Sequence, residues 1–230
     1  MRESLKKYFI YENPTDRSLR LNGSINRRMT AMAISILLFI MLLIFVKSGI
    51  TDHMDTEFDQ WAYGLRNGSL NRLLIIITHM GSAPVIIGII AVLLVLPSTR
   101  LHYGVPTMTI SLFSVIIYKI LKILIARPRP DLDLRLVAAS GYSFPSGHSM
   151  NSVIFYGMII FLILRNSENR RVKRAVCTML PILLFLIGFS RIYLACHFLT
   201  DVMAGWLLGI TMVMAVSIAF DEINRNLTLE

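Results

Sequence analysis

Charged residues are scarce in this chain: only 16% of its 230 residues are charged, and 55% are hydrophobic. An average soluble domain has about 25% charged residues, so this composition excludes an ordinary soluble protein and indicates a membrane protein. The only two cysteines, Cys177 and Cys196, lie too far apart along one expected helix to form a disulfide. Because the sequence also lacks internal repeats and long linkers, we expect one integral-membrane domain over residues 1–230.

Long hydrophobic runs take the place of the missing charges. A helix needs about 20 apolar residues to cross about 30 Å of hydrocarbon, and six stretches come close to that length. The predicted spans cover residues 29–49, 80–97, 104–126, 147–165, 174–191 and 201–220. The expected fold class is therefore all-α, a polytopic membrane protein with six transmembrane helices.

Two segments depart from simple spans. The stretch 55–70 mixes acidic with aromatic residues, which predicts a short amphipathic helix at the outer interface after the first span. It would serve as an interfacial anchor or, alternatively, as a lip that admits lipid. The stretch 70–97 is too long for one straight span and contains Gly81 and Pro84, which predicts a short helix, a bend and then a span.

Basic residues collect on one side of the predicted bundle. They occur in the amino-terminal arm, residues 1–28, and in the segment 165–174 between the fourth and fifth spans. Since lysine and arginine favour cytoplasmic loops, we expect the amino terminus to be cytoplasmic. Topology and anionic headgroups then explain the net charge of +9, and no nucleic-acid partner is expected.

Three polar clusters, residues 122–130, 145–148 and 190–201, stand at the ends of predicted spans. An ionisable residue at the centre of a membrane helix costs about 2.5 to 3.5 kcal/mol on insertion scales, so its default interpretation is functional. The third span ends, the fourth begins and the fifth ends at the same membrane face. The clusters should therefore meet, on the extracytoplasmic side.

The cations in these clusters suit a phosphate group. The guanidinium forks of Arg129 and Arg191 match phosphate oxygens in pairs, and Lys122 adds a point charge. Ser146 is a plausible N-cap, and Gly147 lets the backbone approach a ligand at a helix N-terminus, where anions are favoured.

The reactive groups are two imidazoles and one carboxylate. His197 and Asp201 are four residues apart, so on a helix they would share a face, and the carboxylate could keep one imidazole nitrogen protonated. The other nitrogen would then be free to attack phosphorus, while His148 could give a proton to the leaving group and later take one from water. This division of roles predicts a phosphohistidine on His197.

The order and spacing of the clusters resemble the three-part signature of the type 2 phosphatidic acid phosphatase family. The first part matches at Lys122, Arg129 and Pro130, the second at Pro145, Ser146, Gly147 and His148, and the third at Ser190, Arg191, His197 and Asp201. The resemblance is carried by residues 119–209, and the six-span layout extends it over nearly the whole chain.

The resemblance implies hydrolysis of a lipid phosphomonoester or pyrophosphate without metal or cofactor. It assigns His197 as nucleophile, Asp201 as its orienting partner and His148 as general acid. The phosphate-binding residues that it implies are Lys122, Arg129, Ser146, Gly147 and Arg191. It also implies a bacterial cell membrane, with phosphatidylglycerophosphate as the first candidate substrate and undecaprenyl pyrophosphate as the second.

Other interpretations remain at this stage. Lys119, Arg127 and Arg135 fall outside the signature spacing and are expected to be helix-end anchors whose charges reach the headgroups. Two histidines and an aspartate could instead bind zinc, although the ring of cations would oppose a divalent metal. A non-catalytic carrier of anionic lipids could use the same cations but has no need for the histidines. Another alternative is vanadate-dependent oxidation, which is disfavoured because the family's haloperoxidases are soluble.

Overall fold

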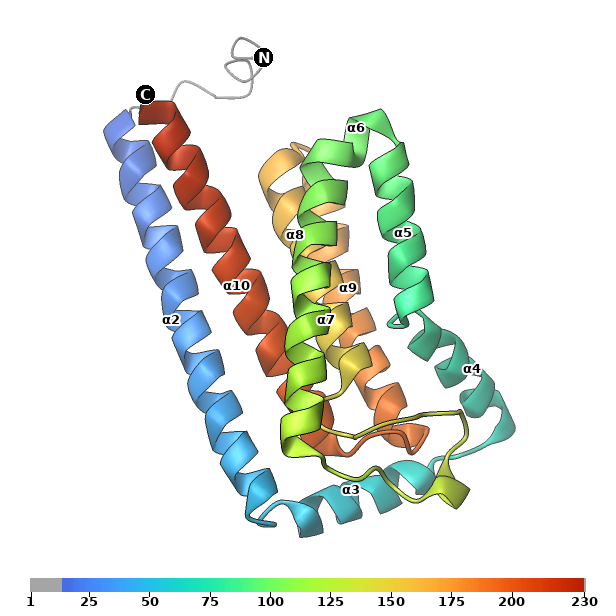
Figure 1. Ribbon diagram of the computed structural model, residues 1–230. Coiled ribbons are helices and arrows are strands. Elements are labelled where there is room, and N and C mark those ends of the chain that lie inside the picture. The colour runs from blue at the N-terminus through green and yellow to red at the C-terminus, as the bar shows by residue number, and fades with distance from the viewer. Residues whose placement is uncertain (1–13, 230) are drawn as a thin grey trace.

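The computed structural model describes residues 14–229, with side chains placed over residues 23–223, and all regular secondary structure in that part is helical (Figure 1). The elements are α2 (Pro14–Lys47), α3 (Asp52–Gly64), α4 (Gly68–His79), α5 (Ala83–Val95), α6 (Pro97–Thr99), the π-helical turn η1 (Arg100–Gly104), α7 (Val105–Ile125), the 3-10 turn η2 (Leu132–Leu134), α8 (Gly147–Asn166), α9 (Arg170–Tyr193) and α10 (Leu199–Leu229).

The chain is a polytopic helical membrane protein, as its composition predicted. Five helical stretches in the described part are long and apolar enough to cross a membrane: Gly23–Lys47, Pro97–Ile125, Gly147–Asn166, Arg170–Tyr193 and Leu199–Ile223. The helices α4 and α5 also meet that test together, with a bend of 46° between them. Counting this bent pair as one broken span gives the predicted six.

The first helix begins earlier than the sequence indicated. Residues 1–13 of the predicted polar arm lie outside the described residues, but α2 already starts at Pro14, well before the predicted span at 29. A hydropathy pattern marks where a helix enters lipid, whereas the backbone hydrogen bonds continue into polar residues beyond that point. The structure therefore makes the second half of the arm a helical extension of the first span.

The segment after the first span forms two helices, not one. The predicted amphipathic helix over 55–70 is wrong at its end, because α3 stops at Gly64 and α4 opens at Gly68. The physical reason is a cap: the Asn67 side chain accepts a hydrogen bond from the backbone N–H of Leu70 at 2.9 Å. Figure 1 shows α3 lying across one end of the bundle rather than along the long helices.

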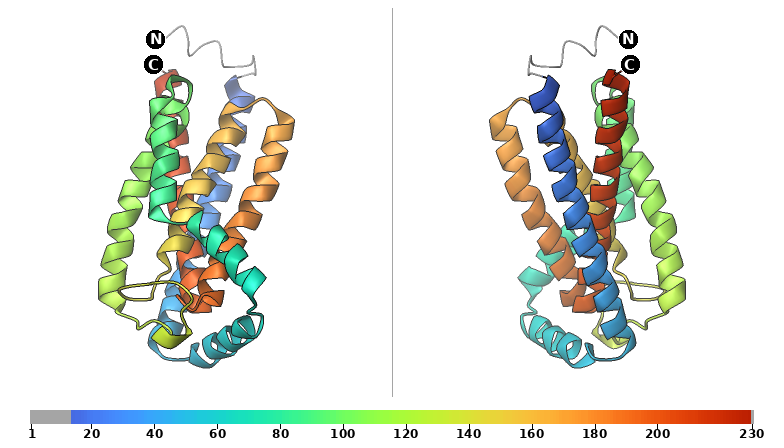
Figure 2. Two further views of the ribbon diagram at one scale, coloured as in Figure 1. Left: turned by 90° about the vertical axis from the view of Figure 1, so that its right-hand side faces the viewer. Right: turned by 90° about the vertical axis from the view of Figure 1, so that its left-hand side faces the viewer.

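The predicted bend before the second span is confirmed. It lies between His79 and Ala83, where α4 gives way to α5. A Cβ on Gly81 would come within 2.6 Å of the Ser152 hydroxyl, so only glycine lets this bend pack against α8. Figure 2 shows α4 slanting across the outside of α9.

The helix α10 packs along both α2 and α8 (Figures 1 and 2). A Cβ on Gly205 would lie 2.7 Å from the Ser146 carbonyl oxygen, and one on Gly209 would lie 2.6 Å from the Val153 Cβ. The spacing of these two glycines therefore serves close packing inside one molecule. Residues that are distant in sequence thereby come together where α10 and α8 begin.

All three polar clusters lie at the same end of the bundle. At that end α7 and α9 finish while α8 and α10 start, as Figure 1 shows. The beginning of α2 and the end of α10 lie at the opposite end.

Candidate active site

The first cluster leaves α7 through a sharp local turn. Ala126 takes a left-handed backbone conformation, with φ of 49°, and two prolines follow at 128 and 130. Proline lacks a backbone N–H and restricts the residue before it, so the helix cannot continue. The side chains of Arg127 and Arg129 consequently start from an extended loop that runs beneath the bundle.

The third cluster is shaped by the turn between α9 and α10. The Arg191 carbonyl oxygen accepts hydrogen bonds from the backbone N–H groups of Cys196 at 2.9 Å and His197 at 3.2 Å. Ala195 closes this turn with a positive φ of 55°. His197 therefore lies before α10, not on a helix as predicted, while Asp201 occupies the first turn of α10.

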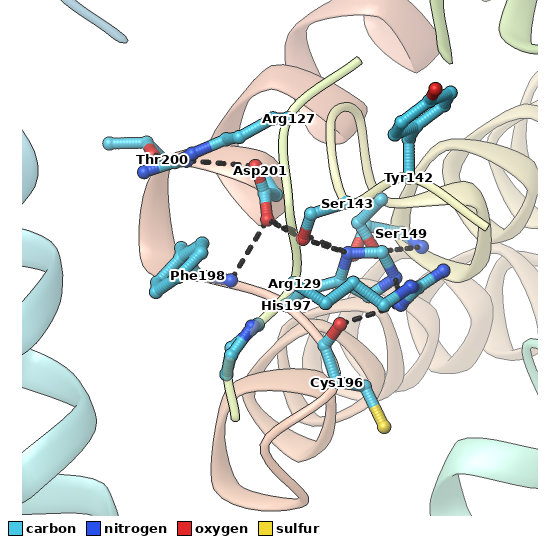
Figure 3. Close-up of polar contacts among 12 residues, drawn as sticks. Arg127, Arg129, Tyr142, Ser143, Ser149, Cys196, His197, Phe198, Thr200 and Asp201 are labelled. Carbon is cyan, nitrogen blue, oxygen red and sulfur yellow. Dashed lines mark hydrogen bonds and ion pairs between the residues drawn. The ribbon is translucent and has the colours of Figure 1, made fainter. Parts of the chain in front are cut away.

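Both ring nitrogens of His197 have neighbours (Figure 3). Its Nε2 lies 3.1 Å from the Arg129 Nη1, and its Nδ1 lies 3.3 Å from the Ser143 hydroxyl. A guanidinium can only donate, so Nε2 must be the accepting nitrogen and Nδ1 the one that carries hydrogen. The nitrogen with the lone pair is thus the one beside the cations.

Asp201 lies behind the histidine. Its Oδ2 is 3.6 Å from the His197 Nδ1, which is a close electrostatic contact rather than a short hydrogen bond. The same oxygen accepts the Ser143 hydroxyl and the Phe198 backbone N–H at 2.9 Å. Ser143 therefore bridges the carboxylate and the imidazole (Figure 3), and a residue to which the sequence assigned no role enters the site.

His197 is only 2% exposed, and its environment sets its charge. Burial lowers the pKa of His197 to about 3, although the nearby Asp201 carboxylate acts in the opposite direction. Desolvation disfavours the charged imidazolium more than the carboxylate favours it. The ring is consequently neutral at neutral pH, which is the state with a free lone pair.

A cavity of about 230 Å³ opens beside this histidine. Its lining residues are Tyr118, Lys122, Arg129, Ala138, Ala139, Ser140, Gly147, His148, Arg191 and His197. Six of the eight predicted site residues thus share one wall. Ser146 and Asp201 are fully buried behind it, where the Ser146 hydroxyl caps α8 by accepting the Ser149 backbone N–H at 3.4 Å.

Backbone carbonyls hold Arg129 and Lys122 in this wall. Arg129 donates to the carbonyl oxygens of Gly141 at 2.9 Å, Ser140 at 2.9 Å and Cys196 at 2.6 Å. The Lys122 ammonium group donates to the carbonyl oxygen of Tyr142. These contacts fix the two cations without neutralising them, because a carbonyl carries no net charge.

Arg191 is held from a different element. Its Nη1 donates to the Thr78 hydroxyl of α4 at 2.8 Å, and its Nε is buried with no hydrogen-bond partner among the described residues. The contact with Thr78 could not be predicted from local sequence, because Thr78 and Arg191 are 113 positions apart. The broken second span thus contributes directly to the site.

Of the three cations that the sequence analysis treated as helix-end anchors, two are held in the site region. Arg127 is not an anchor: its guanidinium lies 2.7 Å from Asp55 and 2.9 Å from Asp201, both buried. Charge pairing with two carboxylates there outweighs solvation at the headgroups. Arg135 folds onto its own loop, donating to the Pro130 carbonyl oxygen at 2.6 Å.

A larger cavity of about 440 Å³ lies near the start of α2 and the end of α10. Arg28 and Asp221 form an ion pair in its wall. Its lining includes none of the eight predicted site residues.

Comparison with known proteins points to one family. Residues 104–225 match the PAP2 superfamily. The chain is 30% identical to phosphatidylglycerophosphatase B of Bacillus subtilis over 192 residues, covering 81% of this chain and 92% of the relative. It is also 27% identical to an undecaprenyl-diphosphatase of Sulfolobus acidocaldarius over 185 residues, covering 76% of this chain and 84% of that protein.

Two solved structures resemble the fold. The crystal structure of a transmembrane PAP2 type phosphatidylglycerolphosphate phosphatase from Bacillus subtilis matches with a TM-score of 0.74 and 30% identity, covering 84% of this chain and 96% of that one. The crystal structure of Aquifex aeolicus LpxE matches in fold with a TM-score of 0.57 and 24% identity, covering 70% of this chain and 93% of that one.

Proposed function

The chain belongs to the PAP2 superfamily, and from that premise we propose that it is an integral-membrane lipid phosphatase acting through a phosphohistidine. The observation that carries the proposal is the neutral, buried His197, whose accepting nitrogen faces a cavity lined by Lys122, Arg129 and Arg191. A nucleophile with a free lone pair beside fixed cations is what phosphoryl transfer requires.

In the first step the phosphate group of the lipid enters the cavity among the cations. Arg129 exchanges its contact with the His197 Nε2 for the phosphate oxygens, and Nε2 attacks phosphorus. The bond from phosphorus to the lipid oxygen breaks, and His148 gives its proton to the departing oxygen. The dianionic phosphate supplies the counter-charge that a protonated His148 needs among so many cations.

In the second step a water molecule replaces the lipid alcohol. His148, now neutral, takes a proton from this water, whose oxygen attacks the phosphohistidine. The phosphorus–nitrogen bond breaks, inorganic phosphate leaves, and Nε2 regains its lone pair. Asp201 supports both steps by holding the Nδ1 hydrogen in place, directly and through Ser143.

The backbone of the α8 N-terminus completes the cradle. The first N–H groups of a helix have no partner inside it, and Gly147 brings them into the cavity wall. Ser146 contributes by capping the helix from behind. These donors and the side-chain cations supply the positive field that other phosphoryl-transfer sites obtain from metal ions, which supports a reaction independent of metal.

Phosphatidylglycerophosphate is the first candidate substrate and undecaprenyl pyrophosphate the second. The reason is that one of the two relatives is named for each of these reactions. The proposed location is the bacterial cell membrane, with a cytoplasmic amino terminus and the cavity on the extracytoplasmic face. The basic residues beyond the opposite ends of the spans support this orientation.

The test is a phosphate-release assay on purified protein in detergent with a chelator present. Its panel comprises phosphatidate, phosphatidylglycerophosphate, diacylglycerol pyrophosphate and undecaprenyl pyrophosphate. We expect release from at least one lipid and inhibition by vanadate, which mimics the transition state of phosphoryl transfer. Lipid binding without release of phosphate from any of them would favour the carrier alternative instead.

A further inference from the structure

Arg127 sits between two buried carboxylates that come from opposite ends of the sequence. Its Nη1 donates to the Asp201 Oδ1 at 2.9 Å, and its Nη2 donates to the Asp55 Oδ2 at 2.7 Å. The ring of Phe198 covers the guanidinium at 4.3 Å, which helps to keep water out. Asp55 is 1% exposed and Asp201 is fully buried, so these charges pair in a region of low dielectric.

Asp55 also holds the start of α10. One of its oxygens accepts the Thr200 backbone N–H at 3.0 Å, and the other accepts the Thr200 hydroxyl at 2.6 Å. That hydroxyl in turn accepts a hydrogen bond from the Arg127 Nη1 at 2.7 Å. A carboxylate from α3 therefore satisfies a free N–H at a helix N-terminus 145 residues further along the chain.

This network ends at the nucleophile. With Oδ1 of Asp201 held by Arg127, the remaining oxygen, Oδ2, is directed to Ser143 and to the Nδ1 of His197. A carboxylate that is free to rotate about its last bond would present either oxygen to the imidazole. The hydrogen bond from Arg127 to Oδ1 removes that freedom, and the Thr200 hydroxyl accepts a hydrogen bond from the same Arg127 nitrogen. Figure 3 shows Arg127, Thr200 and Asp201 side by side.

We propose that Asp55 and Arg127 are positioning residues for the proposed reaction, which orient Asp201 and through it the imidazole of His197. The inference rests on the proposed phosphatase function. It makes α3 part of the active site, because this helix supplies Asp55. The outer side of the same helix is open, with Trp61 54% exposed. Catalysis then requires α3 to be seated against the start of α10.

Substrate binding and turnover should respond differently if this is so. The cations of the cavity, Lys122, Arg129 and Arg191, are held by carbonyl groups and by Thr78, which lie outside the network. Arg129 alone also touches the end of the network, at the His197 Nε2, and in the proposed reaction a bound phosphate replaces that contact. Disturbing Asp55 should therefore lower kcat and weaken inhibition by vanadate, the transition-state mimic, while KM stays nearly unchanged. A residue that only holds the fold together would lower the amount of folded protein and leave the kcat of the folded fraction intact.

The first experiment compares Asp55→Asn with Asp52→Asn. Asp52 lies on the same helix, 3.9 Å from Arg127, but its side chain is 69% exposed, so it is a control matched for charge. A misplacement of about 1 Å can cost about 100-fold in rate, and we expect kcat of Asp55→Asn to fall about 10- to 100-fold. KM should change less than about twofold, and Asp52→Asn should match the wild type.

A second pair of variants keeps the test valid if Asp55→Asn fails to fold. Thr200→Val deletes the bridging hydroxyl at nearly constant shape, whereas Thr200→Ser keeps it. Both are measured per mole of monodisperse protein by phosphate release and by vanadate inhibition. We expect Thr200→Val to lose about 10-fold in kcat and Thr200→Ser to recover most of it.

The outcomes separate this inference from the function on which it rests. If the wild type releases phosphate and both Asp55→Asn and Thr200→Val keep the wild-type kcat, the positioning role is overturned and the phosphatase stands. If KM rises by as large a factor as kcat falls, the network serves the cradle rather than the nucleophile, and the role is again overturned. If the wild type releases no phosphate from any lipid, both proposals fall.

Discussion

At the scale of single residues, the charge of His197 decides whether the cavity can react. The ring must keep its lone pair on the nitrogen that faces the cations, and burial ensures this by lowering its pKa to about 3. The contact with Arg129 indicates the tautomer with hydrogen on Nδ1, because the Arg129 N–H donates to Nε2 at 3.1 Å. In the proposed reaction this nitrogen is therefore ready to attack before any phosphate arrives.

The sequence identified the wall of the site but not its supports. Lys122, Arg129 and Arg191 could be selected because the signature spacing is local information. Ser143 and Thr78 could not, because a hydroxyl that meets its partner only after folding leaves no pattern in the chain. Arg127 was misjudged for the same reason, since Asp55 lies 72 residues away.

Asp59 yields a prediction about stability at the residue scale. This carboxyl on α3 is buried, and burial raises its pKa to about 7. Among the described side chains only Tyr63 donates to it, at 3.3 Å. Between about pH 4 and pH 7 the folded protein keeps a proton that the unfolded chain releases, so the free energy of unfolding falls as pH rises through this interval. Asp59→Asn removes that dependence.

The measurement is the thermal unfolding midpoint in detergent at pH 5 and pH 8. We predict that Asp59→Asn unfolds at least about 3 °C above the wild type at pH 8, corresponding to about 1 kcal/mol, and that the gap shrinks at pH 5. The exposed loop variant Asp133→Asn is the control and should match the wild type at both values. An equal gap at both pH values would argue against a protonated Asp59.

At the scale of elements, the contact between α8 and α10 brings the second and third clusters together. The Ser146 backbone N–H donates to the Asp201 carbonyl oxygen at 2.9 Å, which ties the two helix starts directly. Gly205 makes this approach possible, one helical turn after Asp201. The six-span pattern was predictable from hydropathy, but such a close approach depends on side-chain volume at a single position.

Gly205→Ala should therefore damage both stability and turnover. Its Cβ would come within 2.7 Å of the Ser146 carbonyl oxygen, and overpacking of this kind costs about 1 to 3 kcal/mol. We predict a lower unfolding temperature together with a lower kcat, because Asp201 and the α8 N-terminus move apart. Gly88→Ala on α5, where nothing lies within 4 Å of the added carbon, should change neither, and equal behaviour of the two variants would refute this role for Gly205.

At the scale of the whole molecule, the polar site occupies one end of a bundle with an apolar exterior. The long helix α7, for example, exposes Leu112, Phe113, Ile116 and Ile123 along its length, as a lipid-facing surface requires. A lipid substrate can therefore keep its tails in the bilayer while its phosphate reaches the cavity. Figure 1 shows α3 lying across that end of the bundle. A helix in this position would lie at the membrane interface, beside the headgroups.

The orientation can be tested by labelling introduced cysteines in a Cys177→Ser background, in which the remaining Cys196 is fully buried. Asp133→Cys lies in the loop at the site end, and Glu168→Cys lies in the loop between α8 and α9 at the opposite end. We predict that a membrane-impermeant maleimide labels the first on intact protoplasts or spheroplasts and the second only after permeabilisation. The reverse pattern would place the cavity in the cytoplasm.

Direct trapping of the covalent intermediate tests the central claim. A lipid phosphate labelled with ³²P in the transferable group is mixed with the enzyme and quenched in base within the first turnover. We predict that the wild-type protein carries label that is stable to base and labile to acid, as expected of phosphohistidine. The His197→Asn variant should carry none. Continued turnover by His197→Asn, or label that resists acid, would contradict it.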